Sequence, residues 1–321
     1  MKEQGATLVI LTYNHEKYIE AALEGAFSQT YSPLEIIISD DCSTDSTYDI
    51  IQKAVSKYDG KHKVIVNKNE KNQGLANHVN ILFDMAQFDI VITAAGDDIS
   101  LPTRVERSVD LFQKYTNAQS ISFAPITIDE KGNKSSKNEP VNAVQSPERF
   151  ITVTDFLSGT EYKARGYSRA YRKNVMDFFG PLNDNVPAED VILSFRALLT
   201  GGVVESCEKL VCYRVLGESL SSTIGLDKNI ILFNEKYRLL DMVKNIPDSM
   251  VLELKENLIT GFQAMYKILK LHQSKYPLIL FILYILPDPF LKLSMKKSLF
   301  KSCCWLSIPH FFKKRFFKAY R

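Results

Sequence analysis

The stretch ATLVILTYNHEKYIEAALEGAF (residues 6–27) contains one complete unit of strand, loop and helix. A continuous apolar run ends in the polar loop that begins with Thr12, Tyr13 and Asn14. Such runs are typical of strands that are buried on both faces of a sheet. Behind the loop, apolar side chains recur at helical spacing. These side chains are Tyr18, Ala22, Leu23 and Phe27.

The same unit recurs along the chain. The run LEIIISDD (residues 34–41) ends in two carboxylates and precedes a second helical segment. Further strands are predicted over residues 62–69 and 89–96, with a helix over residues 75–86 between them. Strands that alternate with helices predict an α/β fold, in which a mostly parallel, Rossmann-like sheet has helices on both faces.

Polar clusters follow three of the predicted strands, at residues 12–15, 40–44 and 97–98. The carboxyl ends of parallel strands meet at one edge of a sheet, and ligands bind beyond that edge. We therefore expect the three clusters to converge on a single crevice.

The stretch ITAAGDDISLP (residues 92–102) ends a buried strand with two adjacent carboxylates. Asp97 and Asp98 repel each other, so a bound cation is the first candidate to neutralise them. The alternative is that both carboxylates cap the helix that follows Pro102.

Composition limits the class of protein. The chain has 321 residues and 45% hydrophobic content, which is enough for a sizeable core. A net charge of +3 does not support nucleic acid as the partner of the whole chain. Five cysteines without a C-x-x-C motif predict neither a disulfide framework nor a zinc site, and they favour the cytoplasm. Neither a dinucleotide-binding nor a P-loop glycine motif is present.

We predict two domains, residues 1–225 and a helical region over residues 226–321, because strand signals vanish after about Ser222. The apolar run at residues 276–287 is too short to cross a bilayer, which takes about 20 residues. Beyond Asp288 there are nine lysines and arginines among aromatic residues and no acidic residue. This composition predicts a tail that lies on an anionic membrane surface, at the inner face of the plasma membrane.

Several stretches together resemble the family 2 glycosyltransferases, which are inverting enzymes with the GT-A fold, of the bacterial polysaccharide-assembly type. The stretches that carry the resemblance are residues 9–47, 72–80, 94–102, 166–175, 187–202 and 209–221. Their order and spacing over about residues 6–222 make the match specific, although none would suffice alone.

The resemblance implies a site for a nucleotide sugar. Tyr13 would offer its aromatic face to a pyrimidine base, with Thr12 and Asn14 beside it, and Asp41 would accept the imide N–H of uracil. The alternatives are that Tyr13 packs in the interior and that one carboxylate of the Asp40–Asp41 pair caps the following helix. Further residues that fit the family's nucleotide-sugar site are Asn72, Gly74, Asn80 and Asp97.

The resemblance also implies a divalent cation, Mn²⁺ or Mg²⁺, that bridges the diphosphate. Asp98 would bind the cation, and Asp97 would contact either the ribose or the cation. Three positions depart from the family pattern, namely Ala95 in the acidic motif, Val79 in place of an arginine and Leu216 in place of a histidine. The diphosphate charge would then be met by one of three other cations. These are Lys71, Arg104 and Arg214.

On the acceptor side, the family pattern points to Asp190 as the general base, with Glu189 and Arg214 near it. A single base without a carboxylate nucleophile implies direct displacement and inversion at the anomeric carbon. The alternative is that Glu189 and Asp190 only stabilise the helix they begin, through its macrodipole.

These expectations predict a glycosyltransferase that moves a sugar, from UDP for preference, to a lipid-linked saccharide in cell-surface polysaccharide synthesis. One alternative is a non-catalytic, membrane-associated protein with the same fold. Another is a sugar-1-phosphate nucleotidyltransferase, which the absence of glycine from the stretch LTYNHEKY (residues 11–18) disfavours. We expect His15 and His78 to be structural or surface groups.

Overall fold

The computed structural model describes residues 4–135, 147–157, 162, 165–184, 186 and 188–216. The chain divides into two compact units, Met1–Gly225 and Leu226–Arg321, and the described residues belong to the first. The predicted helical region over residues 226–321 and its basic, aromatic tail therefore lie outside the described residues. No helix in the described part has the length and apolar character needed to cross a bilayer.

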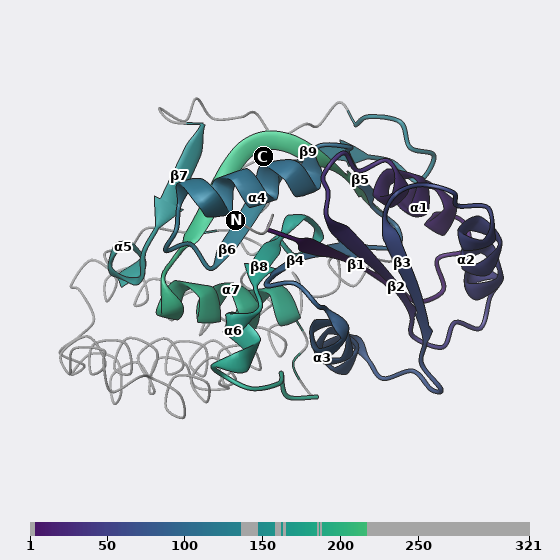
Figure 1. The fold of residues 1–321 in the computed structure, drawn as a ribbon, viewed down its shortest axis with the longest axis horizontal. Coiled ribbons are helices and arrows are strands. Elements are labelled where there is room, and N and C mark those ends of the chain that lie inside the picture. The colour runs from purple at the N-terminus through teal and green to yellow at the C-terminus, as the bar shows by residue number, and fades with distance from the viewer. Residues whose placement is uncertain are drawn as a thin grey trace, which may run out of the picture. The chain divides into compact units, whose positions relative to one another are not determined.

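Up to β4, strands and helices alternate as predicted (Figure 1). After β4 the alternation stops, because two strands or two helices then follow one another in several places. The strands are β1 (Ala6–Thr12), β2 (Leu34–Asp40), β3 (Lys63–Lys68), β4 (Ile90–Ala95), β5 (Ile99–Ser100), β6 (Ser120–Ile128), β7 (Glu148–Ile151), β8 (Ala170–Arg172) and β9 (Val203–Arg214). The helices are α1 (Ile19–Phe27), α2 (Thr47–Ser56), α3 (Leu75–Met85), α4 (Arg104–Lys114), α5 (Val153–Leu157), the 3₁₀ helix η1 (Gly166–Ser168), α6 (Asn174–Asp177) and α7 (Glu189–Thr200).

The strands of the described residues form one sheet in the order β3-β2-β1-β4-β8-β6-β9-β5, with β7 paired to β9. The half formed by β3, β2, β1 and β4 is parallel, as the sequence predicts. Beyond β4 the sheet is mixed, because β8 pairs antiparallel with both β4 and β6. Strand β6 is parallel to β9, with a register shift next to Pro125, which cannot donate a main-chain hydrogen bond.

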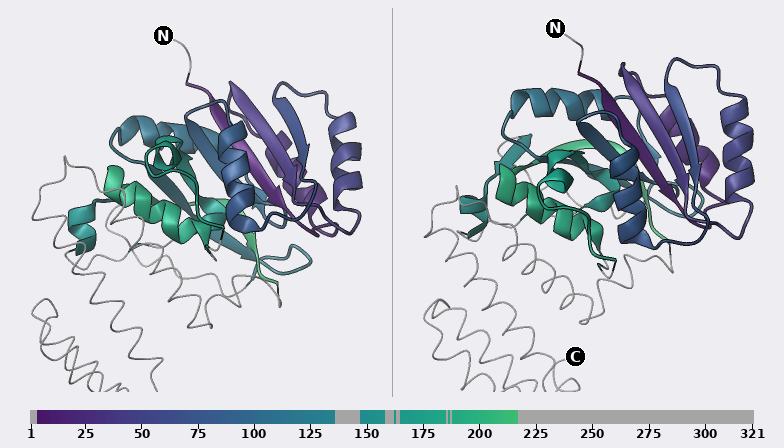
Figure 2. Two further views of the ribbon diagram at one scale, coloured as in Figure 1. Left: turned by 90° about the horizontal axis from the view of Figure 1, so that it is seen from below. Right: turned by 60° about the horizontal axis from the view of Figure 1, so that its bottom comes forward.

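Helices cover both faces of the parallel half. Leu8 and Ile10 of β1 belong to the same buried cluster as side chains of α1, α2 and α4. Helix α3 packs on the opposite face, where Val79 and Leu82 are buried, and α7 lies on that side as well (Figures 1 and 2). Strands β1 and β2 are therefore buried from both sides, which explains their continuous apolar sequences.

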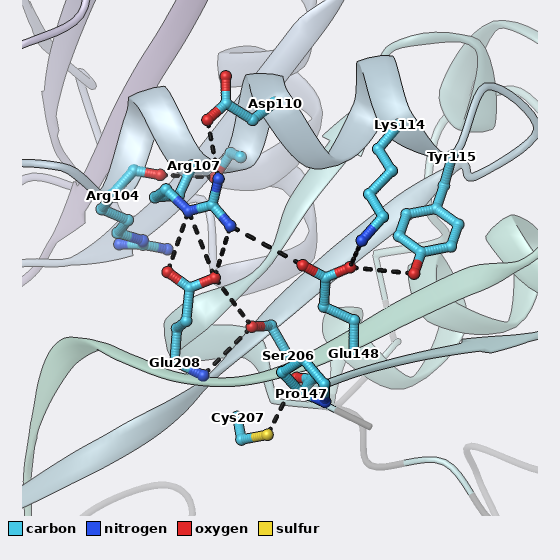
Figure 3. A network of polar contacts seen from close by, with 11 residues as sticks. Arg104, Arg107, Asp110, Lys114, Tyr115, Pro147, Glu148, Ser206, Cys207 and Glu208 are labelled. Carbon is cyan, nitrogen blue, oxygen red and sulfur yellow. Dashed lines mark hydrogen bonds and ion pairs between the residues drawn. The ribbon is translucent and has the colours of Figure 1, made fainter. Parts of the chain in front are cut away.

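Helix α4 is fixed to β7 and β9 by a polar network (Figure 3). The guanidinium of Arg107 binds both carboxylate oxygens of Glu208, with Nη2 to Oε1 at 2.8 Å and Nε to Oε2 at 3.0 Å. Glu148 of β7 accepts from Lys114 and from the hydroxyl of Tyr115. The hydrogen bond to Glu208 raises the pKa of Arg107 above its ordinary value. Helix α4 begins after β5, six residues beyond Asp98, so the network fixes the helix that follows the acidic segment.

Gly25 of α1 permits close contact with β5. A Cβ atom at this position would lie 2.7 Å from the main-chain oxygen of Ser100, which cannot move aside cheaply. We predict that Gly25→Ala lowers the free energy of unfolding by about 1–3 kcal/mol, because the contact is overpacked. An unobstructed helix would instead gain ~1 kcal/mol from this substitution. Chemical denaturation measures the difference, with Glu24→Ala on the exposed side of α1 as the control. A more stable Gly25→Ala variant would contradict the packing.

Candidate active site

Strands β1, β2 and β4 end side by side at one edge of the sheet. Thr12 is in register with Asp40, and Leu11 with Ala95. Main-chain hydrogen bonds continue past the strands, from Asp41 N to Thr12 O at 2.9 Å and from Gly96 N to Leu11 O at 2.8 Å. The three polar clusters therefore lie at the same edge.

The first two loops of this edge are tied together by Asn14. Its Oδ1 accepts from Thr44 N at 2.8 Å, and its own N–H donates to Ser43 Oγ at 2.9 Å. Asn14 has φ 56°, a left-handed conformation that asparagine tolerates better than most residues. Next to it, the side chain of Tyr13 is 41% exposed. The ring is thus accessible for stacking and does not pack in the interior.

The two carboxylates after β2 have different partners. Asp40 accepts from Ser43 N at 2.9 Å, so it holds the turn that leads to α2. Asp41 is buried, and its Oδ1 accepts from Asn69 Nδ2 and from Gln73 N, both at 2.8 Å. Its Oδ2 accepts from Gly74 N at 3.1 Å. Asp41 therefore anchors the loop before α3, a contact that the sequence did not predict.

That loop contains two of the predicted site residues. Asn72 Oδ1 accepts from Gly74 N at 2.9 Å, and Gly74 has φ 75°, which favours glycine. Asn80 points elsewhere, because its Nδ2 donates to Leu182 O at 2.9 Å and its Oδ1 accepts from Leu182 N at 2.8 Å. Asn80 thus connects α3 to the segment before α7. Val79 is buried in the core.

Asp97 and Asp98 occupy the turn between β4 and β5, and β9 holds this turn. Asp98 is 4% exposed, and its Oδ1 accepts from Arg214 N at 2.8 Å. Arg214 Nε in turn donates to Asp97 O at 2.9 Å. The carboxylates do not cap α4, whose N-cap is Thr103 and lacks a side-chain capping bond.

Arg214 acts as a clamp across the site. Besides Asp97, its guanidinium donates from Nη1 to Asp129 O and Glu130 O, both at 3.0 Å, and it lies 4.8 Å from the ring centroid of Tyr18. Tyr18 precedes α1 and so does not belong to the apolar face of that helix, contrary to the helical spacing in the sequence. Arg214 is 5% exposed and engaged with the protein, which places it in the framework of the site.

Burial controls the electrostatics of the acidic turn. Loss of water raises the pKa of Asp98 well above its usual range, and the neighbouring charge of Asp97 raises it further. No hydrogen bond among the described residues reaches Asp98 Oδ2. The described residues contain no group of three metal-binding side chains, and the acidic turn itself offers the two carboxylates of Asp97 and Asp98. Such a donor set fits a hard divalent cation that takes its other ligands from phosphate and water.

Two of the three cations proposed for the diphosphate are engaged within the protein. Arg104 is fully buried, and burial lowers its pKa to about 10, although the charge of Asp98 opposes that shift. Arg104 is therefore not available to a phosphate group at the surface. Lys71, in contrast, is exposed in the loop before α3.

The contact between His15 and Gly96, the residue before Asp97, could not be predicted from the sequence. A Cβ atom on Gly96 would lie 2.7 Å from both His15 Nδ1 and Thr12 Oγ1. Thr12 and His15 therefore pack against the residue before Asp97, and Gly96 is small because they do. His78 is buried beneath β2, with its Nε2 2.7 Å from Ser39 Oγ, as expected of a structural histidine.

Glu189 and Asp190 form the first turn of α7. Asp190 Oδ2 accepts from Gly166 N at 2.9 Å, and Gly166 O accepts from Thr93 Oγ1 at 3.2 Å, so Asp190 is connected to β4. Burial, together with the charge of Asp190, raises the pKa of Glu189 to about 8. Glu189 keeps its proton at neutral pH and is poorly suited to accept another, which leaves Asp190 as the candidate base.

Comparison with known families identifies the class of the protein as glycosyltransferase. The model of the family described as "Glycosyl transferase family 2" matches residues 7–178, and the chain belongs to that family. EpsE of Bacillus subtilis, which is named as a glycosyltransferase, is 30% identical over 154 residues. The match covers 48% of this chain and 54% of EpsE, so the chain spans about half of this relative.

A second relative carries a detailed name. The E. coli protein WfaP, named as a UDP-Glc:alpha-D-GlcNAc-diphosphoundecaprenol beta-1,3-glucosyltransferase, is 33% identical over 107 residues, which are 33% of this chain and 41% of WfaP. The name describes WfaP, and the matched part is less than half of that protein.

Solved structures share the fold. S. aureus TarS 1-349, crystallised with UDP, superposes with a TM-score of 0.65 at 16% identity, covering 95% of this chain and 88% of that one. The mannosyltransferase PcManGT of Pyrobaculum calidifontis, in complex with GDP-Man and Mn²⁺, gives a TM-score of 0.57 at 14% identity, with 98% and 84% coverage. At such identities the likeness shows the GT-A fold alone.

The raised pKa of Glu189 predicts a pH dependence of stability. The unfolded chain loses this proton near the ordinary pKa of 4.5, whereas the folded chain keeps it to about pH 8. The free energy of unfolding should therefore fall between pH 5 and pH 8, by at least ~1 kcal/mol relative to Glu189→Gln, which has no proton to lose. Denaturation at several pH values measures the difference, and Asp184→Asn at an exposed position is the control. Parallel curves for wild type and Glu189→Gln would contradict the raised pKa of Glu189.

Proposed function

We propose that this glycosyltransferase moves a sugar from a nucleotide diphosphate, UDP for preference, to a lipid-linked saccharide, with inversion at the anomeric carbon. The observation that carries the proposal is that the exposed ring of Tyr13 and the buried carboxylate of Asp98 lie at the same edge of the sheet. A donor of this kind has a planar base at one end and a charged diphosphate at the other, so it needs both features.

For the donor, Tyr13 would stack on the base. The nucleoside would lie against two loops, the one after β2 that Asn14 holds and the one before α3 that Asp41 holds. Asp98, with Asp97 beside it, would hold Mn²⁺ or Mg²⁺. When bound, such a cation neutralises the charge that develops on the leaving diphosphate. Lys71 is the exposed cation that could approach the same charge.

For the acceptor, Asp190 would take the proton of the attacking hydroxyl. Its hydrogen bond from Gly166 N fixes the orientation of the carboxylate. A single base on the acceptor side supports displacement in one step and hence inversion. The proton of Glu189 also reduces the charge beside Asp190 at neutral pH.

The lipid-linked acceptor is proposed from two sources, the name of WfaP and the basic, aromatic composition of the tail. A protein with such a tail would work at the inner face of the plasma membrane and contribute to the assembly of a cell-surface polysaccharide. Co-sedimentation with vesicles tests the membrane contact. Binding to anionic vesicles is expected to exceed binding to zwitterionic vesicles, and equal recovery on both would contradict it.

Substitution of two carboxylates separates donor binding from chemistry. The purified chain is incubated with Mn²⁺ and a panel of UDP- and GDP-sugars, and the released nucleotide is measured. Asp98→Ala should weaken UDP binding about tenfold or more, which corresponds to ~1.4 kcal/mol. Asp190→Asn should keep UDP affinity and lower kcat about 10²–10⁴-fold.

Asp59→Asn, at an exposed position before β3, is the matched control and should resemble wild type in both measurements. The proposal would be overturned if the wild-type chain turned over no donor and Asp98→Ala bound UDP as tightly as wild type does. Release of pyrophosphate from a nucleoside triphosphate would favour a nucleotidyltransferase instead.

A further inference from the structure

Arg104 is a fully buried cation close to the site, and every hydrogen bond given for its guanidinium is to a neutral oxygen. Nη1 donates to Ser100 Oγ at 2.9 Å, and Nη2 donates to Thr93 O at 2.6 Å and to Arg169 O at 3.4 Å. These oxygens belong to β5, to β4 and to the segment between η1 and β8. One guanidinium thus connects the neighbouring strands β4 and β5 to a segment 65 residues later in the chain.

Burial of this charge is costly for the fold. None of the ion pairs among the described residues includes Arg104, and its Nε is buried without a hydrogen-bond partner. An ion that leaves water without a close counter-ion loses several kcal/mol of hydration. The charge that stabilises Arg104 is the carboxylate of Asp98. An apolar side chain could fill the same space without that cost. What only arginine supplies here is a planar guanidinium whose N–H groups donate to several oxygens at once.

Strand β4, which accepts a hydrogen bond from Arg104, is also connected to the candidate base Asp190. Thr93, whose carbonyl binds Arg104, donates from N to Arg169 O at 3.0 Å and from Oγ1 to Gly166 O at 3.2 Å. Gly166 N donates to Asp190 Oδ2 at 2.9 Å. A continuous series of contacts therefore runs from Ser100 of β5, two residues after Asp98, through Arg104 and Thr93, to the carboxylate of Asp190.

The last contact of this series is tight. A Cβ atom on Gly166 would lie 3.1 Å from Asp190 Cβ and 3.2 Å from Asp190 Oδ2. The backbone of η1 thus lies directly against the carboxylate. A shift of η1 by a few tenths of an ångström would move the hydrogen bond that orients Asp190.

We propose that Arg104 is a positioning residue that holds the acidic turn at Asp98 and the carboxylate of Asp190 in one fixed geometry. This inference rests on the proposed function, in which Asp98 serves the donor and Asp190 serves the acceptor. Arg104 touches neither substrate. It acts by fixing β5, β4 and Arg169, the residue after η1, to one another. A misplacement of about 1 Å between reacting groups can cost about 10²-fold in rate.

Arg104→Lys tests the role, because lysine keeps the positive charge but lacks the planar guanidinium that donates to all three oxygens. The matched control is Arg172→Lys. Arg172 also donates to main-chain carbonyls, those of Ala118 and Phe112, but it lies opposite Ile90 at the start of β4, away from the site. Both substitutions remove a guanidinium from a carbonyl cluster, and only one touches the connection to Asp190.

The first measurement needs no ligand. Hydrogen exchange of the peptide that contains residues 165–169 should become at least about fivefold faster in Arg104→Lys and remain near wild type in Arg172→Lys. The second measurement is donor turnover with Mn²⁺. The kcat of Arg104→Lys should fall about tenfold or more, while its Kd for UDP with Mn²⁺ stays within about twofold of wild type.

Thr93→Val supplies a second variant should Arg104→Lys fail to fold. It removes the hydroxyl that binds Gly166 O and is expected to accelerate exchange at residues 165–169 in the same way. Thr7→Val, which removes a buried hydroxyl near the opposite end of the parallel strands, is its control.

The outcomes separate this inference from the proposed function. Wild-type chain that neither binds UDP nor turns over a donor would overturn the proposed function, while exchange at residues 165–169 would still show whether Arg104 positions η1. Unchanged exchange and kcat in Arg104→Lys would overturn the positioning role. Parallel losses of kcat, UDP affinity and stability would also overturn it, because they would indicate a merely structural residue.

Discussion

The hydrogen bond from Arg214 N to Asp98 Oδ1 is the contact on which the site depends. It ties the turn after β4 to the end of β9, 116 residues later in the chain, and the same residue holds Asp97 O through its guanidinium. Without such donors, two adjacent carboxylates with little access to water would repel each other and lose their solvation. Strand β9 of the mixed half therefore fixes the acidic turn, which follows β4 of the parallel half.

The parallel half could be predicted from sequence because its strands are buried on both faces. The runs before Thr12 and Asp40 are continuous and rich in β-branched residues. Each strand, and the polar residues at its end, can therefore be predicted from the sequence. The position of Asp190 in the first turn of a helix was predictable as well. These features depend on residues that are close together in the chain.

The rest depends on contacts that local sequence does not encode. β5 has two residues and β8 has three, too few for any periodic pattern, although both flank β4 or the acidic turn. Asn80 matches the family's site pattern, yet its amide binds Leu182, 102 residues away. From the sequence, Arg104 and Arg214 are candidates to bind the diphosphate because they are cations. Only the structure shows that both are buried and hold segments of the protein together. In each case tertiary pairing decides the role of the residue.

We propose that Tyr13 and the acidic turn together form one donor site. Crystals grown with UDP and Mn²⁺ and measured at a wavelength where manganese scatters anomalously test it most directly. An anomalous peak should lie within about 2.5 Å of the Asp98 carboxylate, in contact with the diphosphate, and a uracil ring should stack on Tyr13. Ordered UDP whose base lies away from Tyr13, with manganese distant from Asp97 and Asp98, would contradict it.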